Sequence, residues 1–238
     1  MKPNTQTLEV WGELACFSRP EMKVERFSYP VITPSAARGI FDAIYAKPVE
    51  FRWQIDRVEV LSPPSYIALR RNEVKEKASV KLVAQWMTGK SPPEPILADS
   101  DGESTGRTQR QTMALRDVRY RLHARIVPWP GFEHMLPAFQ DQFRRRASKG
   151  KCFYQPFLGC REFPAWFELR EPTAAQPPPI GLDLDIGLML YDVFDLSRPG
   201  GATDPPYITL FRACVEGGVL KIPDFDDPAV IKLPGGVV

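Results

Sequence analysis

The chain has 238 residues, of which 43% are hydrophobic and 25% are charged, and its formal net charge is +2. This is enough apolar material for a large buried core, so we expect a globular protein. The opening residues lack the apolar run of a signal peptide, and no later window reaches the ~20 apolar residues that cross a bilayer, which predicts a cytoplasmic protein without a membrane partner. Four cysteines without a CxxC pair and only two histidines exclude the common metal-binding patterns, so we expect no metal and no cofactor.

The small net charge hides an uneven distribution along the chain. Residues 107–151 contain eleven Arg and Lys against three Asp and Glu, a local charge of +8. Residues 172–238 contain four basic and nine acidic residues, a local charge of −5. A basic middle beside an acidic end indicates a localised nucleic-acid surface, without deciding between DNA and RNA.

The first elements are readable from their periodicity. Alternating apolar residues predict strands over 7–17 and 51–61. Between them, Thr33 is a suitable N-cap and Pro34 suits the first helical position, which predicts a helix. That helix should end near residue 45, because Pro48 disfavours helical backbone just before it.

The middle of the chain is less regular at first. Residues 62–106 hold proline clusters, a charged segment and a polar loop over 99–106, and the pattern assigns them no clear element. Residues 110–127 then alternate strictly, which predicts a strand with one apolar face and one cationic face. A helix over 132–148 and a last strand over 157–171, broken by Pro164, follow. The predicted row of basic side chains on the strand is Arg119, Arg121, His123 and Arg125.

This order predicts an α+β protein with two domains. Strand, helix, strand, insertion, strand, helix and strand is the pattern of a ferredoxin-like domain, similar to the RNA-recognition motif, over residues 1–171 with an insertion at 62–107. A proline-rich linker with Pro172, Pro177, Pro178 and Pro179 leads into residues 172–238. Short strands separated by Gly-containing turns predict a small antiparallel β domain there.

Residues 144–163 carry the densest mixture of cations, aromatics and turn residues in the chain. Basic groups attract phosphates and aromatic faces stack unpaired bases, whereas the simpler alternative is a solvated helix end followed by a buried strand. Lys149 and Lys151 also have a sufficient structural role at a helix C-terminus, where they oppose the helix dipole. The predicted RNA-binding residues are Arg116, Arg119, Arg121, His123, Arg144, Arg145, Arg146, Lys149, Lys151 and Tyr154.

Several segments, taken in order, resemble a known family. The segments 8–17, 33–45, 111–120, 144–163 and 185–192 are similar to the CRISPR-associated Cas-five family of subtype I-C, part of the RAMP superfamily. The resemblance covers nearly the whole chain and is weakest over 66–107. It implies an RNA-recognition-like N-terminal domain with a small β domain behind it.

The resemblance also implies a function. Members of this family are metal-independent endoribonucleases that cleave CRISPR precursor RNA within its repeats and stay on the 5′ handle as a subunit of the interference complex. The implied partners are the repeat hairpin RNA or crRNA and the other subunits of the type I-C complex. Duplex DNA is an alternative partner that the basic charge leaves open. Attack by the ribose 2′-hydroxyl would leave a 2′,3′-cyclic phosphate.

The family's active site pairs a tyrosine with a lysine-histidine pair, and only the tyrosine has a clear counterpart. Tyr45 matches it by position and neighbours, whereas the positions expected for the pair, Ala138 and Phe139, have no acid–base capacity. His134, one turn earlier, could replace the histidine, so Tyr45 and His134 are the predicted catalytic residues. The alternatives are a hydrogen-bonding or stacking role for Tyr45, a non-catalytic subunit that caps the 5′ handle, and a nonspecific duplex-DNA binder.

Overall fold

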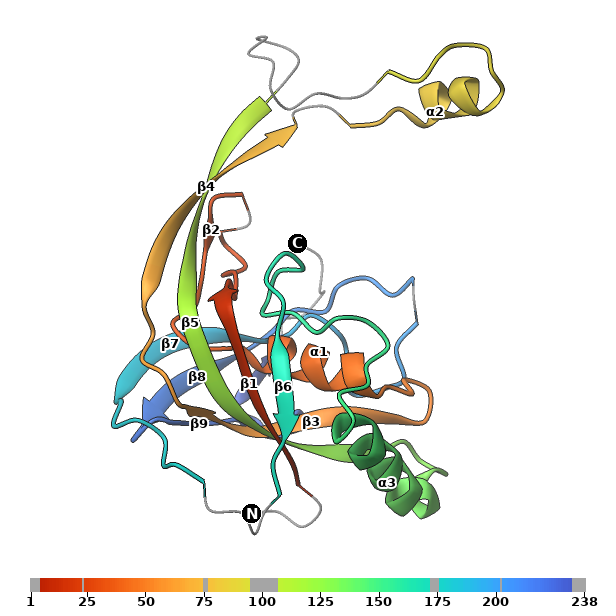
Figure 1. Cartoon of the computed structure of the whole chain (residues 1–238). Coiled ribbons are helices and arrows are strands. Elements are labelled where there is room, and N and C mark those ends of the chain that lie inside the picture. The colour runs from red at the N-terminus through yellow and green to blue at the C-terminus, as the bar shows by residue number, and fades with distance from the viewer. Residues whose placement is uncertain are drawn as a thin grey trace.

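The computed structural model describes residues 5–22, 24–74, 77–94, 107–171, 176–201 and 203–232. It is a mixed α/β fold dominated by one large, mainly antiparallel sheet (Figure 1). The helices are α1 (Pro34–Ile44), α2 (Val80–Met87), the short 3-10 helix η1 (Glu133–Met135) and α3 (Leu136–Ala147). The strands are β1 (Gln6–Ala15), β2 (Arg26–Phe27), β3 (Phe51–Val60), β4 (Tyr66–Val74), β5 (Arg107–Pro128), β6 (Trp166–Leu169), β7 (Leu184–Asp192), β8 (Thr209–Glu216), β9 (Val219–Lys221) and β10 (Val230–Lys232).

The strand order along the sheet is β10-β8-β9-β3-β5-β1-β6. Strand β5 is the central strand of the sheet. Strands β1 and β3 pair with the second half of β5, while β4 and the two-residue β2 pair with the first half. Strand β7 pairs with β8, and β9 joins this C-terminal group to β3. The sheet is therefore continuous from the N-terminal strands into the C-terminal ones.

Helix α1 forms where its capping residues predict it. The Thr33 side chain accepts a hydrogen bond from the Ala36 backbone nitrogen at 3.2 Å, and Pro34 occupies the first turn. The helix ends at Tyr45, whose backbone is extended. These contacts confirm the predicted start and end of the helix.

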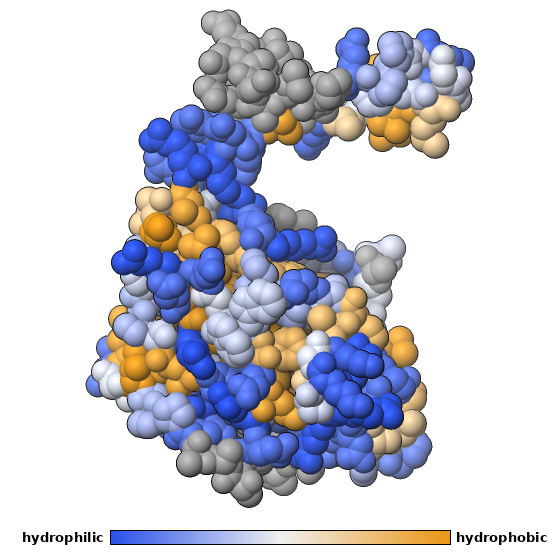
Figure 2. All heavy atoms as spheres, in the orientation of Figure 1, coloured by the Kyte–Doolittle hydropathy of each residue, from blue (hydrophilic) through white to orange (hydrophobic). Residues whose placement is uncertain are grey.

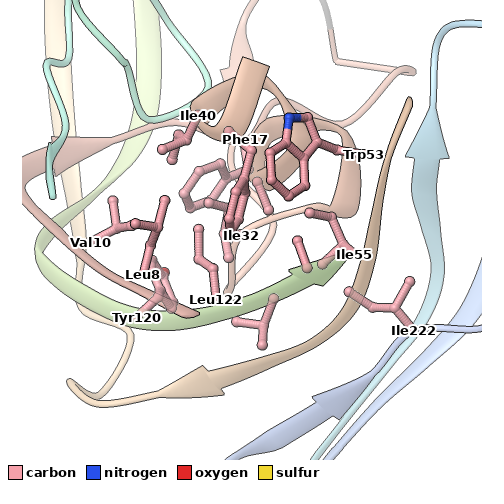
Figure 3. Packing of buried hydrophobic residues seen from close by; sticks show 14 of the residues in the cluster. Leu8, Val10, Phe17, Ile32, Ile40, Trp53, Ile55, Tyr120, Leu122 and Ile222 are labelled. Carbon is pink, nitrogen blue, oxygen red and sulfur yellow. The ribbon is translucent and has the colours of Figure 1, made fainter. Parts of the chain in front are cut away.

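The core lies between the sheet and the two helices α1 and α3. Figure 3 shows the part of it between the sheet and α1. Leu8, Tyr120 and Leu122 come from the sheet, and Ile40 comes from α1. From α3, Phe139 and Phe143 add an aromatic layer against Phe41, Phe51 and Trp53. Aromatic ring contacts of this kind stabilise a core by more than the burial of their apolar surface alone.

The structure contains elements that the periodicity did not predict. Strand β4 and the first half of β5 form an arm that extends away from the body, with β2 paired to β5 near its base, and α2 follows β4 (Figure 1). None of the residues of β4 or α2 is buried. The predicted polar loop at 99–106 and Pro172 of the predicted linker lie outside the described residues.

The last predicted strand is shorter than expected. Only Trp166–Leu169 forms β6, because Gly159 and Pro164 turn the preceding chain into a loop closed by a bridge between Phe157 and Pro164. No helix among the described residues is both long and apolar enough to cross a membrane.

Candidate nucleic-acid interface and active site

Tyr45 lies directly after α1, at the point where α1 meets the C-terminal half of α3. Its ring packs 5.4 Å from the ring of Phe51, and its carbonyl accepts a hydrogen bond from Trp53 Nε1 at 2.8 Å. Burial raises the pKa of its phenol, while Lys47 opposes that effect. A phenol with a raised pKa stays protonated at neutral pH, so it can donate a hydrogen bond but is a poor base.

Two cations border this position. The Nε atom of Arg146 donates to the carbonyl of Ile44 at 2.6 Å, and its guanidinium lies 4.1 Å from the ring centroid of Phe153. Lys47 forms an ion pair with Glu50 at 2.9 Å. The end of α1 therefore combines one phenol with two fixed positive charges.

His134 lies in η1, exposed at the start of the helical segment that continues into α3. Within the described part of the chain, no hydrogen bond or ion pair joins it to Tyr45. At the positions expected for the lysine-histidine pair, Phe139 is 1% exposed in the core and Ala138 faces solvent. The structure thus provides Tyr45 with no bonded acid–base partner among the described residues.

The basic segment after α3 is exposed and held close to α1. Gly150 has a φ of +62°, so the chain leaves α3 through a left-handed residue, and the Phe153 nitrogen then donates to the Ala43 carbonyl at 2.7 Å. Arg144 donates to the Gln6 side chain at 2.9 Å, and Arg145 contacts Gln142. The surface over α3 is hydrophilic (Figure 2). The exposed residues here are Arg144, Arg145, Lys149, Lys151 and Tyr154, whereas Arg146 is half-buried.

The polar face of β5 differs from the predicted row of exposed cations. Arg121 is 3% exposed and His123 is 2% exposed. Arg121 Nη1 lies 2.5 Å from Glu59 of β3, and its Nη2 donates to the Pro177 carbonyl at 2.9 Å. For these two residues the predicted exposed face is wrong, because β3 and the segment that contains Pro177 cover them.

His123 is enclosed with the same carboxylate. Its Nε2 lies 3.0 Å from Glu59 Oε1, and its Nδ1 lies 3.2 Å from Thr7 Oγ1. Burial lowers the pKa of His123. Burial also disfavours the charge on Glu59, but His123, Arg121 and Arg57 outweigh it and hold the pKa of Glu59 at about 2.

The other two predicted contacts on β5 are exposed. Arg116 donates to Ser65 Oγ at 3.1 Å, close to the base of the arm. Arg119 donates to Glu9 at 2.6 Å, and its guanidinium lies 5.3 Å from the ring of Trp11. Both guanidinium groups are reachable from solvent.

One group of residues was not singled out from the sequence. Arg38 and Asp42 are four residues apart on α1, and Arg38 forms a bidentate ion pair with the buried Asp192 of β7 at 2.7 and 3.0 Å. Two charged residues at this spacing on a mostly apolar helix were the available signal. Elsewhere in the described ranges, no group of three His, Cys, Asp or Glu residues is arranged to hold a metal ion.

Comparison with known proteins places this arrangement in a family. A family model described as CRISPR-associated protein (Cas_Cas5) matches residues 6–223. The chain therefore belongs to the CRISPR-associated Cas5 family. The model that it matches is the Cas5d one, and subtype I-C is consistent with it.

Two relatives support the assignment along most of the chain. A CRISPR pre-crRNA endoribonuclease Cas5d of Thermus thermophilus is 43% identical over 193 residues, 81% of this chain and 75% of the relative. A protein of the same name from Mannheimia succiniciproducens is 41% identical over 230 residues, 93% of this chain and 96% of the relative. A solved CRISPR-associated protein shares the fold with a TM-score of 0.60 at 19% identity, covering 95% of this chain and 96% of that one.

Proposed function

We propose that this chain is a pre-crRNA endoribonuclease that cleaves CRISPR repeat RNA and stays bound to the product as a subunit of a type I-C interference complex. The observation that carries the proposal is the 41–43% identity, over most of the chain, to two proteins named for this activity. The exposed basic segment after α3, which begins next to the phenol of Tyr45, supports it.

The fold suits this role. We propose that the N-terminal part is ferredoxin-like, because β6-β1-β5-β3 is the strand order of that fold and α1 and α3 contribute to the core beside those strands. We further propose that residues 172–238 act as an appended β unit, joined to it through the pairing of β9 with β3.

We propose a metal-independent reaction in which the ribose 2′-hydroxyl attacks the adjacent phosphorus and leaves a 2′,3′-cyclic phosphate. The phenol of Tyr45, protonated at neutral pH, would orient the 2′-hydroxyl or donate a proton to the departing 5′-oxygen. Lys47 and Arg146 would stabilise the extra negative charge on the phosphorane. His134 is the proposed proton acceptor, brought to the scissile nucleotide by the RNA.

The proposed RNA surface follows the exposed cations. It contains Arg144, Arg145, Lys149, Lys151 and Tyr154 after α3, with Arg146 anchoring the segment, and Arg116 and Arg119 on β5. Arg121 and His123 are left out, because they are buried against Glu59.

A second function has one specific observation in its favour. Tyr45 is 5% exposed and has no described acid–base partner, which suits a non-catalytic subunit that caps the 5′ handle. Binding of duplex DNA rests on the basic segment alone.

The deciding experiment incubates the purified chain with the repeat RNA of its own locus in EDTA. We expect cleavage that continues in EDTA and stops when the scissile nucleotide carries a 2′-deoxy substitution. Full cleavage of the deoxy substrate would refute the 2′-hydroxyl mechanism, and loss of cleavage in EDTA would refute metal independence. Tight binding without cleavage would favour the capping subunit.

A further inference from the structure

A cavity of about 590 Å³ lies along the outer side of α1. Its floor is α1 itself, including Arg38, Gly39 and Asp42. The borders include Tyr154, from the chain after α3, and Phe194, from the loop after β7. In Figure 1, α1 lies beside the chain that runs from α3 to β6. The volume is within the range of small-molecule sites, roughly 300–1,000 Å³.

The cation on the floor is already paired. Arg38 forms ion pairs with Asp42 and with the buried Asp192, so it is not free to bind a phosphate. Both oxygens of Asp192 bind Arg38, and Oδ2 of Asp42 does so at 2.5 Å. Oδ1 of Asp42 has no hydrogen bond to another residue in the described part of the chain. The floor therefore offers a fixed acceptor to a ligand that donates N–H groups.

The two borders offer aromatic faces above this acceptor. Phe194 is 53% exposed and Tyr154 is 50% exposed, although both are large side chains that normally lose solvent contact. The guanidinium of Arg38 lies 5.3 Å from the centroid of Phe194, which holds that ring at the cavity edge. Two exposed rings in one lining suit a flat, polarisable ligand.

We infer that this cavity binds one unpaired, amino-bearing nucleobase of the RNA, namely adenine, guanine or cytosine. The base would stack on Phe194 or Tyr154, and its exocyclic amino group would donate to Asp42, a pairing that carboxylates make with base amino groups. Cations at the cavity lining, Arg52 and Arg198, would meet the flanking phosphates. Uracil, which has no amino group, should bind less well. The inference rests on the proposed function, since it names one nucleotide site on the same RNA.

Gly39 provides a way to fill the cavity without damaging the fold. A Cβ built at Gly39 meets no atom within 4 Å, and a larger residue also suits a helix interior better than glycine. Gly39→Phe should therefore block the site, whereas Gly39→Ala adds one methyl group and is the matched control. Phe194→Ala removes one stacking face. Trp166→Ala, which removes a ring that is 55% exposed outside the cavity, is the second control.

The test measures affinity for the repeat RNA by fluorescence anisotropy, with the bases of its unpaired segments removed one at a time and the scissile nucleotide 2′-deoxy. In the unsubstituted protein we expect one position at which the abasic RNA binds about tenfold more weakly, since stacking contributes roughly 1–3 kcal/mol per base. Gly39→Phe and Phe194→Ala should bind intact RNA about tenfold more weakly and lose the sensitivity to that position. Gly39→Ala and Trp166→Ala should keep it.

Other outcomes overturn the inference. The inference fails if no abasic position lowers the affinity for RNA, or if folded Gly39→Phe still distinguishes the abasic RNA. It also fails if Gly39→Phe impairs only assembly with other subunits, because the cavity would then be a protein-docking site. A sensitive position occupied equally well by uracil would refute the role of Asp42. Because these readouts are affinities, they are separate from cleavage. If the protein does not cut the unmodified repeat RNA but still discriminates the abasic position, the endoribonuclease is refuted and the base site stands.

Discussion

Arg144 and Arg145 are exposed at the end of α3, whereas Arg146 is tied to the carbonyl of Ile44 and to the ring of Phe153. We predict that Arg144→Gln combined with Arg145→Gln changes RNA binding, at a cost in stability limited to the hydrogen bond from Arg144 to Gln6. If each arginine neutralises one phosphate of a single strand, the slope of log affinity against log salt should become shallower by about 1.4. Over a fourfold range of salt, that change corresponds to about sevenfold in relative affinity.

Arg146→Ala should mainly lower the free energy of unfolding. It removes a hydrogen bond from a charged donor and a cation–π contact, together about 2 kcal/mol of the free energy of unfolding. We expect a larger fall in the unfolding midpoint from this change than from the double variant, because Arg146 loses two contacts.

The assay is fluorescence anisotropy with labelled repeat RNA between 50 and 200 mM NaCl, and thermal unfolding is measured on the same samples. The matched control is Arg212→Gln combined with Lys221→Gln, two exposed cations in the acidic C-terminal part of the chain. An unchanged salt slope in the double variant would mean that Arg144 and Arg145 are solvated side chains at a helix end and do not bind phosphates. An equal change in the control would show that net charge matters and not this surface.

Three further predictions concern the site and the fold. Tyr45→Phe should lower the single-turnover cleavage rate by about 10²-fold or more at unchanged RNA affinity, and His134→Ala should have the same effect. If both variants cleave at the wild-type rate, the catalytic residues lie elsewhere in the chain. Glu59→Gln should lower the free energy of unfolding by about 3 kcal/mol at pH 7, because it leaves Arg121 buried without its charge partner. Since the pKa of Glu59 is about 2 in the folded protein, its contribution is present above about pH 4.5 and is lost as the pH falls toward 2, a loss that the variant should lack. Gly159→Ala should destabilise the protein by about 1–3 kcal/mol in chemical denaturation, because φ is +83° there and the new Cβ would lie 2.1 Å from a backbone oxygen. An unchanged denaturation midpoint would contradict the close packing of that loop.

The elements that the sequence predicted well are those with local signals. Helix α1 has its cap, its proline and its apolar spacing within twelve residues, and β3 alternates on both sides of a register shift between Ile55 and Arg57. The arm escaped prediction for a physical reason. The inward positions of β4 are only half-buried, and they change from Ile67 and Leu69, which pack against the core, to Arg71 and Glu73. The apolar alternation is therefore too short to predict the strand.

The candidate site depends more on contacts between distant segments, which a sequence pattern does not contain. Alternation on β5 correctly separates its two faces, but nothing local shows that Glu59 and the Pro177 carbonyl cover Arg121. The same holds for the cavity over α1, where Tyr154 and Phe194 come from segments forty residues apart in the chain.

The 22-residue strand β5 also has a mechanical consequence. Its first half belongs to the arm and its second half to the body, so the two parts share one continuous backbone and have no loop between them. Near the changeover lies Asp117, whose φ of +52° is the one positive value at a non-glycine residue in the described ranges. A force on the arm would therefore act directly on the central sheet, because no flexible connection lies between them. Asp117 is the residue at which the shared backbone leaves the extended conformation.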